Sequence, residues 1–442
     1  MTLRSNCLID VATAVLIVLA LSLVADWRAQ HPGPSQWMKG DFNRHLGAEH
    51  DEIARSIRAG EGFSSPFRVS SGPTAWMPPV LPYILAACYW VTDDDARSVV
   101  DLILVAKSLV LILTGVITLA EARTLGLWKF GVGAIVVGYG CEFYYLFQVT
   151  HDVWLIMLVL DCVWMCCSVL RSDNHVSSVL WGGVGGVALL CSPVVGLVWG
   201  VITIAQSRST KQRRSMLLAV IFCVVIATPW CVRNRVVLGK WIPIKSNGVY
   251  EVWQSLCVDE DGVLDLATIR QHPYSSSNRE RQHYVEIGEI QFVGEKTPAV
   301  LAKLQTQPLD FAERILARFI AACQYYSPLD KRDEQLWSTS IHRTLFFLPF
   351  LFWCVLIVSF RWQPRRAKVA VLIYASYLCP YILISFYDRY GAPLIGIKLL
   401  LIVYGVATCR GALTRRHVEG SCQSDVAGAR RETRQKQSTN LL

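Results

Sequence analysis

Three carboxylates lie close together in the stretch EHDEIARSIRAG: Glu49, Asp51 and Glu52. The pattern predicts a helix over residues 48–59, in which Glu49 and Glu52 are three apart and share a face near the helix start. The helix macrodipole favours negative charge there. A carboxylate in that place can act as a general base that takes a proton from an acceptor hydroxyl. The alternative is that the acids only cap an interfacial helix.

Further candidates occur far along the chain. Asp152 lies in THDVW, Arg389 and Tyr390 in YDRYGAP, and Arg233 and Asn234 in PWCVRNR. A guanidinium can pair with a phosphate through two hydrogen bonds, so Arg389 and Arg233 are candidate phosphate ligands. The alternatives are that Arg389 extends to lipid headgroups and that Arg233 and Asn234 form a structural turn.

The elements that must position these residues are membrane helices. Of the 442 residues 53% are hydrophobic and 17% are charged, a composition typical of a polytopic membrane protein. Apolar runs predict an all-α protein with about ten transmembrane helices. The expected spans are residues 8–25, 98–120, 130–148, 153–170, 178–191, 194–206, 215–230, 343–360, 369–386 and 393–409.

The distribution of basic residues predicts the orientation. SRSTKQRRS, RWQPRRAK and the tail are rich in Lys and Arg and are expected inside, which places the N-terminus inside as well. The short apolar segment 78–91 is expected to lie in the outer interface. The expected units are 1–25 (first span), 26–97 (first external loop, with the candidate acids), 98–230 (bundle), 231–341 (second external region), 342–410 (last spans) and 411–442 (disordered cytoplasmic tail).

In the second external region we expect amphipathic helices, broken at Pro308, that lie against the membrane and help to close a lipid groove. The net charge of +9 lies largely in the cytoplasmic segments and implies no nucleic-acid partner. Most of the 15 cysteines occur in apolar runs, where they act as small hydrophobic residues, and no zinc-type CxxC pair or disulfide framework is indicated.

Four ionisable residues fall within apolar runs: Lys107, Glu142, Asp161 and Lys398. Charges inside a membrane are functional candidates, and a transporter or lipid flippase would use them as a relay. That is the alternative function; no inverted repeat supports it. A scaffold for envelope assembly is a third interpretation.

The order and spacing of several motifs resemble the GT-C superfamily of membrane glycosyltransferases, relatives of protein O-mannosyltransferases and lipid A aminoarabinose transferases. They are EHDEIARSIRAGEGF with PTAWMPPVLPYILA, then GGVALLCSP, PWCVRNRVVLGKWIPIKSN and DRYGAP. The resemblance covers most of the chain up to about residue 410. It implies that Glu49 is the catalytic base, with Asp51 and Asp41 as alternatives. It also implies that Asp152 orients the acceptor or helps to bind a metal.

The resemblance implies a substrate-binding E-x-x-R-Y motif at Glu280, His283 and Tyr284, with His283 in place of the arginine. Tyr250 and Trp253 could stack on a sugar or anchor the chain at the interface.

The expected function is transfer of a sugar from a polyprenyl-phosphate donor to a lipid, glycan or protein acceptor. The reaction is expected to invert the anomeric centre and to occur on the outer (periplasmic) face of the inner membrane. The acids would suit Mg²⁺ or Mn²⁺ as well as no metal.

Overall fold

The computed structural model describes most of the chain, in the ranges 2–31, 46–148, 151–169, 175–206, 210–259, 261–264, 266–275, 279–324 and 336–412. Asp41 and residues 413–442 of the tail lie outside the described residues, so the expectations for them stay predictions.

Six helices of the described residues are long and apolar enough to cross a bilayer. They are α1 (Thr2–Gln30), α4 (Ala96–Thr124), α9 (Thr210–Leu238), α15 (Leu336–Val358), α16 (Arg365–Leu383) and the terminal helix (Asp388–Ala412), which begins with the 3-10 segment η5 (Asp388–Leu394). Shorter helices complete the bundle: α5 (Trp128–Cys141), α6 (Val153–Val169), α7 (His175–Cys191) and α8 (Pro193–Gln206). Each expected span coincides with one of these helices, and the expectation of an all-α polytopic membrane protein is confirmed.

Glycine allows α7 and α9 to pack closely. A Cβ added at Gly182 would lie 2.4 Å from the carbonyl oxygen of Ala219, and one at Gly186 would lie 2.6 Å from Ile226. Because neither position can carry a side chain without a shift of the neighbouring helix, the GG pairs of this segment serve helix packing.

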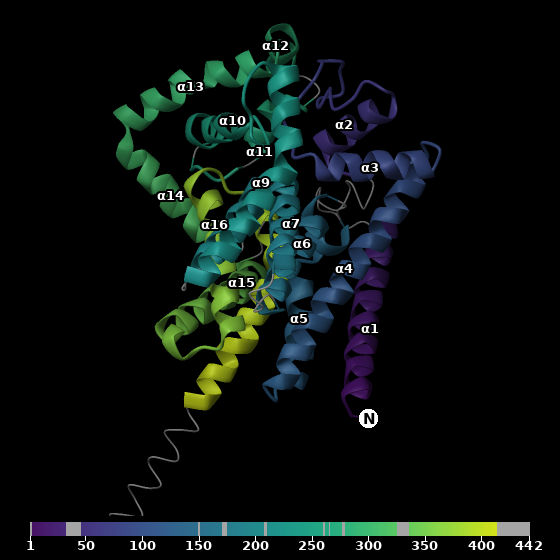
Figure 1. Cartoon of the computed structure of the whole chain (residues 1–442), viewed down its shortest axis with the longest axis vertical. Helices are drawn as coiled ribbons and strands as arrows, with labels where there is room; N and C mark the ends of the chain where they lie inside the picture. Colours follow the sequence, from purple (N-terminus) through teal and green to yellow (C-terminus); the bar gives the residue numbers. More distant parts are fainter. Residues whose placement is uncertain are drawn as a thin grey trace, which may run out of the picture.

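Helix α3 (Val80–Val91) lies across the upper end of the bundle, whereas α1 runs along its length (Figure 1). Asp95 caps the start of α4 by accepting hydrogen bonds from the backbone N–H groups of Arg97 and Ser98, each at 3.2 Å. The interfacial position expected for this segment stays a prediction.

The upper end of the bundle in Figure 1 carries the remaining helices. They are α2 (Ala48–Arg58), α10 (Gly248–Trp253), α11 (Leu266–Gln271), α12 (Arg279–Ile287), α13 (Glu289–Thr306) and α14 (Pro308–Cys323). Helices α13 and α14 form an arch, and α14 begins at Pro308, where the sequence predicts a break. Leu309 and Leu316 on α14 are exposed apolar side chains.

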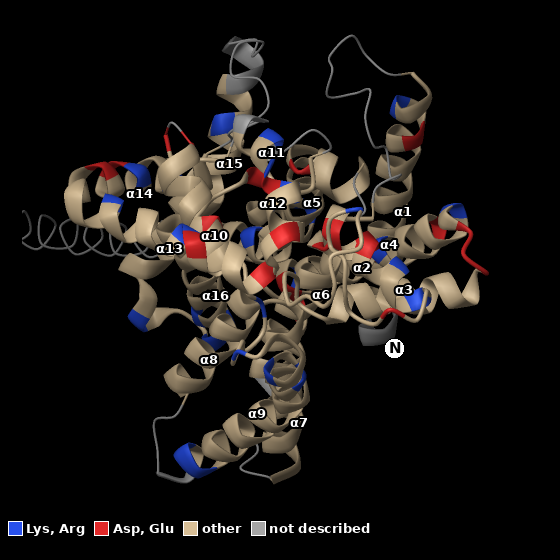
Figure 2. Ribbon diagram, turned by 90° about the horizontal axis from the view of Figure 1, so that it is seen from above, with Lys and Arg blue, Asp and Glu red and all other residues tan. Residues whose placement is uncertain are grey.

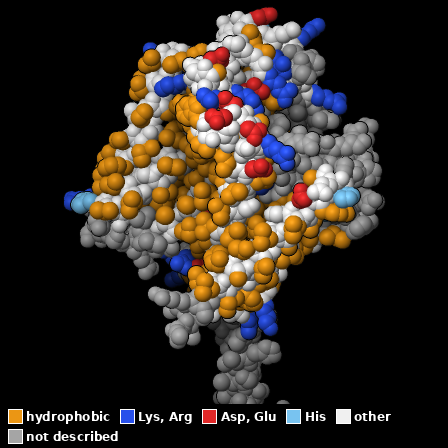
Figure 3. All heavy atoms as spheres, turned by 90° about the vertical axis from the view of Figure 1, so that its right-hand side faces the viewer, with side chains coloured by type: hydrophobic (Ala, Val, Ile, Leu, Met, Phe, Trp, Pro, Cys, Tyr) orange, Lys and Arg blue, Asp and Glu red, His pale blue; other side chains and the backbone are white. Residues whose placement is uncertain are grey.

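The distribution of apolar and charged side chains on the surface is typical of a membrane protein. Figure 3 shows a broad apolar face below a cap of charged side chains. Seen from above, acidic residues gather near the middle of the upper end, among α2, α6, α10 and α12 (Figure 2).

Candidate active site

Helix α2 presents Glu49 near its start. Gly47, with φ +91°, turns the chain into the helix, and its carbonyl accepts a 2.8 Å hydrogen bond from the N–H of Asp51. Further along the same helix, Ile53 and Ala54 are buried. Glu49 Oε1 lies 3.6 Å from Nε2 of His272, which follows helix α11. Helix α2 and the segment after α11 therefore meet at Glu49.

Asp152 and Arg389 each lie at the start of a membrane helix. Asp152 begins α6, where its carbonyl accepts the N–H groups of Leu155 and Ile156. Arg389 lies in the first turn of the terminal helix, and its NH1 donates to Nδ1 of His151 at 2.7 Å.

Asp388 orients the backbone at Arg389. Its Oδ1 accepts the N–H of Arg389 at 2.8 Å and the hydroxyl of Tyr145 at 2.6 Å. Tyr145 lies on the short π-helical segment η2 (Tyr144–Gln148), between α5 and α6. The contact holds the start of the terminal helix against the segment that leads to Asp152.

Three of the residues singled out from the sequence are brought together. Asp152 and Glu49 both act electrostatically on the buried guanidinium of Arg389. The same two carboxylates act on the imidazole of His50. Segments at least 103 residues apart thus place two carboxylates within electrostatic range of one guanidinium, in one cluster at the upper end of the bundle.

Aromatic and acidic side chains border this cluster. Tyr390 stacks on Tyr381 with ring centroids 4.4 Å apart and planes at 20°. Glu251 of α10 accepts hydrogen bonds from Lys245 at 3.4 Å and from Asn247 at 3.2 Å. It also acts electrostatically on both tyrosines. A flat aromatic face beside acidic groups can take the apolar face of a sugar while carboxylates accept from its hydroxyl groups.

Two histidines belong to the cluster and were not identified from the sequence. Burial lowers the pKa of His50, opposed by Asp152 and Glu49. Burial also lowers the pKa of His272, opposed by Glu49 and Glu251. Both rings are therefore neutral at pH 7 and have an acceptor nitrogen as well as a donor. A single His in a helix or loop carries no pattern, so only the fold could identify them.

The other acids of α2 point elsewhere. Asp51 accepts the hydroxyl of Tyr89 at 2.6 Å and Nε of Arg55 at 3.2 Å. It lies two positions from Glu49, which is about 200° around a helix. Glu52 lies 3.8 Å from Arg68, and its pKa is raised by burial and by Asp51.

Arg233 and Asn234 donate hydrogen bonds to backbone carbonyls within the protein. Arg233 donates to the carbonyls of Thr74 at 2.6 Å and Phe63 at 2.7 Å. Asn234 is fully buried and donates to the carbonyl of Ile242 at 2.9 Å. These contacts join α9 to segment 63–74 and to Ile242, so both residues have a structural role. Because both lie within helix α9, the structural turn that the sequence offered as an alternative is wrong.

The E-x-x-R-Y-like residues also have partners within the protein. Glu280 accepts from Lys296 at 2.6 Å, and His283 lies 2.7 Å from Glu295. Tyr284 is buried and donates to Glu289 at 2.9 Å. No contact of these three residues with the cluster is described, so their role in substrate binding stays a prediction.

Glu289 continues this network. Its carboxylate accepts the hydroxyl of Thr74 and, at 2.9 Å, the N–H of Ala75. Tyr250 is buried against Trp76 and Phe292, whereas Trp253 lies under the ammonium group of Lys296, 4.3 Å from its ring centroid. His272 packs edge-on against the Tyr250 ring of this aromatic core, with the two ring centroids 5.7 Å apart.

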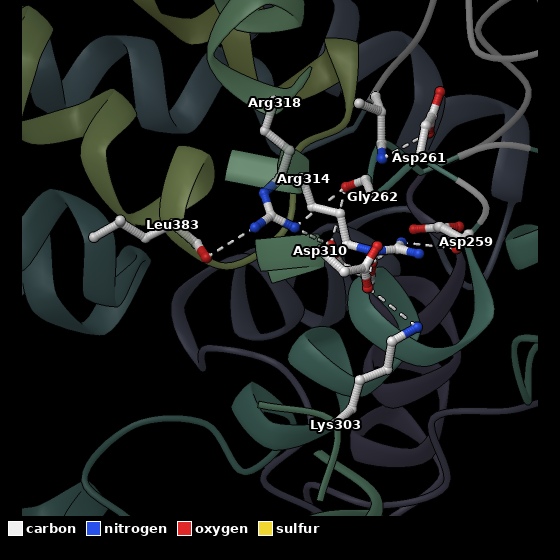
Figure 4. Close-up of polar contacts among 10 residues, drawn as sticks. Asp259, Asp261, Gly262, Lys303, Asp310, Arg314, Arg318 and Leu383 are labelled. Atoms are coloured by element: carbon white, nitrogen blue, oxygen red, sulfur yellow. Dashed lines mark hydrogen bonds and ion pairs between the residues drawn. The ribbon is translucent and has the colours of Figure 1, made fainter. Parts of the chain in front are cut away.

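The buried Arg318 attaches helix α14 to the end of α16, shortly before Arg389, and the buried Arg314 lies near it on the same helix (Figure 4). Arg318 donates to the carbonyls of Ile382 at 2.7 Å and Leu383 at 3.2 Å, at the end of α16. Arg314 pairs with Asp310 at 3.0 Å. Gly262, which both arginines surround, has φ +82°, and a Cβ there would lie 2.7 Å from Arg314.

Val263 forms a parallel bridge with Phe386, and the N–H of Leu264 donates to the carbonyl of Phe386 at 3.0 Å. Together these contacts position the chain just before Arg389.

An apolar groove of about 340 Å³ opens between α5, α15 and the terminal helix. Its walls include Val137, Phe346 and Leu399. Its polar end is the buried ion pair of Glu142 and Lys398, 2.6 Å apart.

The polar end of this groove lies beside the cluster. The ammonium nitrogen of Lys398 lies 3.5 Å from the Cβ position of Gly391, two residues after Arg389. Glu142 acts electrostatically on Asp388. The ion pair that lines the groove therefore lies near the segment that carries Arg389.

Within the described ranges, no group of three or more His, Cys, Asp or Glu side chains has the arrangement of a metal site.

No protein-family model and no curated protein sequence match the chain. Among solved structures it is similar to the archaeal oligosaccharyltransferase AglB from Archaeoglobus fulgidus, in complex with an inhibitory peptide and a dolichol-phosphate. The TM-score is 0.46 at 12% identity, over 95% of this chain and 51% of AglB. It is also similar to ArnT from Cupriavidus metallidurans bound to undecaprenyl phosphate, with a TM-score of 0.38 at 14% identity, over 89% of this chain and 77% of ArnT.

The chain thus spans about half the length of AglB. Both proteins belong to the GT-C superfamily that the sequence motifs resemble. Because both similarities are weak, the chemistry of the site is argued from this chain's own residues.

Proposed function

We propose that the protein is a membrane glycosyltransferase that moves a sugar from a polyprenyl-phosphate donor to a hydroxyl acceptor at the upper end of the bundle. The observation that carries the proposal is the cluster of Glu49, Asp152 and Arg389 beside an apolar groove. The reaction needs a base for the acceptor, a cation for the leaving phosphate and an apolar path for the lipid, and these features supply all three.

Glu49 is the base in this proposal. Its carboxylate takes the proton of the acceptor hydroxyl as the acceptor oxygen attacks the anomeric carbon from the side opposite the phosphate. Asp51 is the weaker candidate, because Tyr89 and Arg55 already bind its oxygens. Asp152, on the other side of the cluster, orients the acceptor or the sugar by accepting from a hydroxyl.

Arg389 binds the leaving group. As the bond from the anomeric carbon to the phosphate oxygen breaks, negative charge increases on the lipid phosphate, and a buried guanidinium stabilises that charge strongly. NH1 of Arg389 contacts His151, whereas its Nε has no hydrogen-bond partner among the described residues. Burial of a donor without a partner costs free energy, so a ligand that accepts from it is favoured.

The groove would hold part of the prenyl chain. Its length lies along membrane helices, and its polar end carries Lys398, whose charge is neutralised by Glu142. The pairing of these two residues across helices also gives them a structural role, so they do not by themselves favour a transporter.

The test is mass spectrometry of envelope glycans, lipids and proteins from cells that lack the gene. We expect one glycosylated species to disappear and to return with the wild-type gene but not with Glu49→Gln. An unchanged glycan profile together with a changed transport phenotype would contradict the proposal and favour a transporter.

A further inference from the structure

The mechanism above does not use His50, although this residue lies at the centre of the cluster. Its side chain is 7% exposed, and its Nδ1 is buried without a hydrogen-bond partner among the described residues. Nε of Arg389 is likewise buried without a hydrogen-bond partner among the described residues. Native proteins pair most buried polar atoms, so two unpartnered atoms in one cluster are unusual.

The imidazole is held by its surroundings. Gly47 approaches it so closely that a Cβ at that position would lie 3.3 Å from Cδ2 of His50. Charged groups from four segments act on the ring: Glu49 of α2, Asp152 at the start of α6, Lys245 before α10 and Arg389 of the terminal helix. Two are anionic and two cationic, and none forms a described ion pair with the ring.

The surroundings indicate which kind of group would complete the site. The two carboxylates near the ring favour a ligand group that can donate a hydrogen bond, and a hydroxyl can donate to a carboxylate and also bond to a neutral imidazole. The ring is neutral at pH 7 because its burial disfavours the charged form. A sugar or an acceptor alcohol has such hydroxyls.

We propose that His50 binds the substrate directly, through a hydrogen bond between its imidazole and a hydroxyl of the transferred sugar or of the acceptor. This inference rests on the proposed glycosyltransferase function. It assigns to His50 a role in positioning and selecting the substrate, beside the base Glu49.

Stability separates this role from a structural one. In His50→Phe a flat ring, one atom larger, is kept and the unpartnered nitrogen is removed, so the stability of the free protein should stay close to that of wild type. Replacing a histidine that supports the fold would lower the stability.

The experiment uses the full-length protein. The species that disappears on gene deletion identifies the donor sugar and the acceptor. The initial rate of its formation is then measured in membranes of deletion cells that carry wild type, His50→Phe, His50→Asn or, as a matched control, His175→Phe at the far end of the bundle. The thermal unfolding midpoint of each purified variant is measured in detergent.

We expect His50→Phe to form product roughly tenfold more slowly at equal abundance, with a nearly unchanged midpoint, which corresponds to one lost hydrogen bond. His50→Asn should stay within about threefold of wild type, because an amide offers a donor and an acceptor near Nδ1. His175→Phe should equal wild type. A raised KM for the donor assigns the hydroxyl to the sugar, and a raised KM for the acceptor assigns it to the acceptor.

A wild-type rate in His50→Phe would overturn the inference, and so would a lowered rate accompanied by a lowered midpoint. A slow His50→Asn variant of native stability still supports the contact, since the amide lacks the reach of the ring. If gene deletion removes no glycosylated species, the proposed function itself fails, which is a different result.

Discussion

Charged residues have different hydrogen-bond partners at the two ends of the helix bundle. At the lower end in Figure 1, Asp10 accepts from Arg123 and, at 2.7 Å, from Nε1 of Trp128. Glu121 is bonded by Arg366 and Tyr404. These carboxylates are satisfied within the protein.

At the upper end, by contrast, His50 and Arg389 each keep a buried polar atom without a partner in the described chain, and two carboxylates lie beside them. The comparison teaches that the lower end uses charge for stability, whereas the upper end keeps hydrogen-bonding capacity for a ligand. Buried polar groups without partners cost stability and are concentrated at functional sites.

The largest expected effect is on turnover at the upper end. Glu49→Gln should lower the rate of sugar transfer roughly 10²- to 10⁴-fold, because general base catalysis contributes about that much. The unfolding midpoint should hardly change. Rates in membranes at equal protein abundance check this, with Glu61→Gln on the exposed end of the same loop as the control. If both variants behave alike, Glu49 is not the base.

At the lower end the same kind of change should act on stability. Glu121→Ala leaves Arg366 and Tyr404 without their acceptor and should lower the free energy of unfolding by about 3 kcal/mol. Turnover per folded molecule should remain that of wild type. Thermal unfolding in detergent measures the loss of stability. A loss of specific activity would show that the lower end of the bundle also contributes to turnover.

Arg389→Lys sharpens the assignment of the phosphate site. The substitution keeps the charge and removes the planar fork, so kcat/KM for the lipid donor should fall roughly ten- to hundredfold, equal to about 1.5–3 kcal/mol. Kinetics with varied donor concentration check this. An unchanged kcat/KM would mean that Arg389 only reaches the headgroup region.

The pH dependence of stability tests the buried histidines. The pKa values of His50 and His272 are lower in the folded than in the unfolded chain, so the unfolded state takes up protons first as the pH falls below about 6.5. Their contribution to stability is complete above that pH. Below about pH 6.5 the free energy of unfolding should decline by up to about 1.4 kcal/mol per pH unit for each ring. Unfolding midpoints from pH 8 to 5 measure the effect, and His50→Phe should weaken it.

The smallest effect should come from Asp51→Asn. This side chain is tied to Tyr89 and Arg55, so its loss should cost about 1 kcal/mol of stability or less and change turnover less than about threefold. A loss of turnover as large as that of Glu49→Gln would move the catalytic base to Asp51.

Much of the fold could be predicted from the sequence because the apolar runs are long. The expected span 98–120 lies within α4, and the expected span 369–386 largely coincides with α16. The interfacial position predicted for α3, which stays a prediction, rests on its shortness and on the acids after it. The turn chemistry that ends α3, with Asp93 and Asp94 at positive φ, carried no such signal.

The site could be predicted only in part. Glu49, Asp152 and Arg389 are charged residues at expected span ends, so residue type and position indicated them. The pairing of Glu49 with His272 joins residues 223 positions apart, and no local pattern encodes it. For Arg233 and Tyr284, residue type alone could not show that Arg233 binds the carbonyl of Thr74 and that Tyr284 binds the carboxylate of Glu289.

A structure of the protein in lipid nanodiscs with added undecaprenyl phosphate tests the central claim most directly. The account predicts density for a phosphate within hydrogen-bond distance of the Arg389 guanidinium and within a few ångströms of Asp152 and Glu49. The prenyl chain should enter the groove between α5, α15 and the terminal helix. A phosphate bound elsewhere, or an empty groove at saturating lipid, would contradict it.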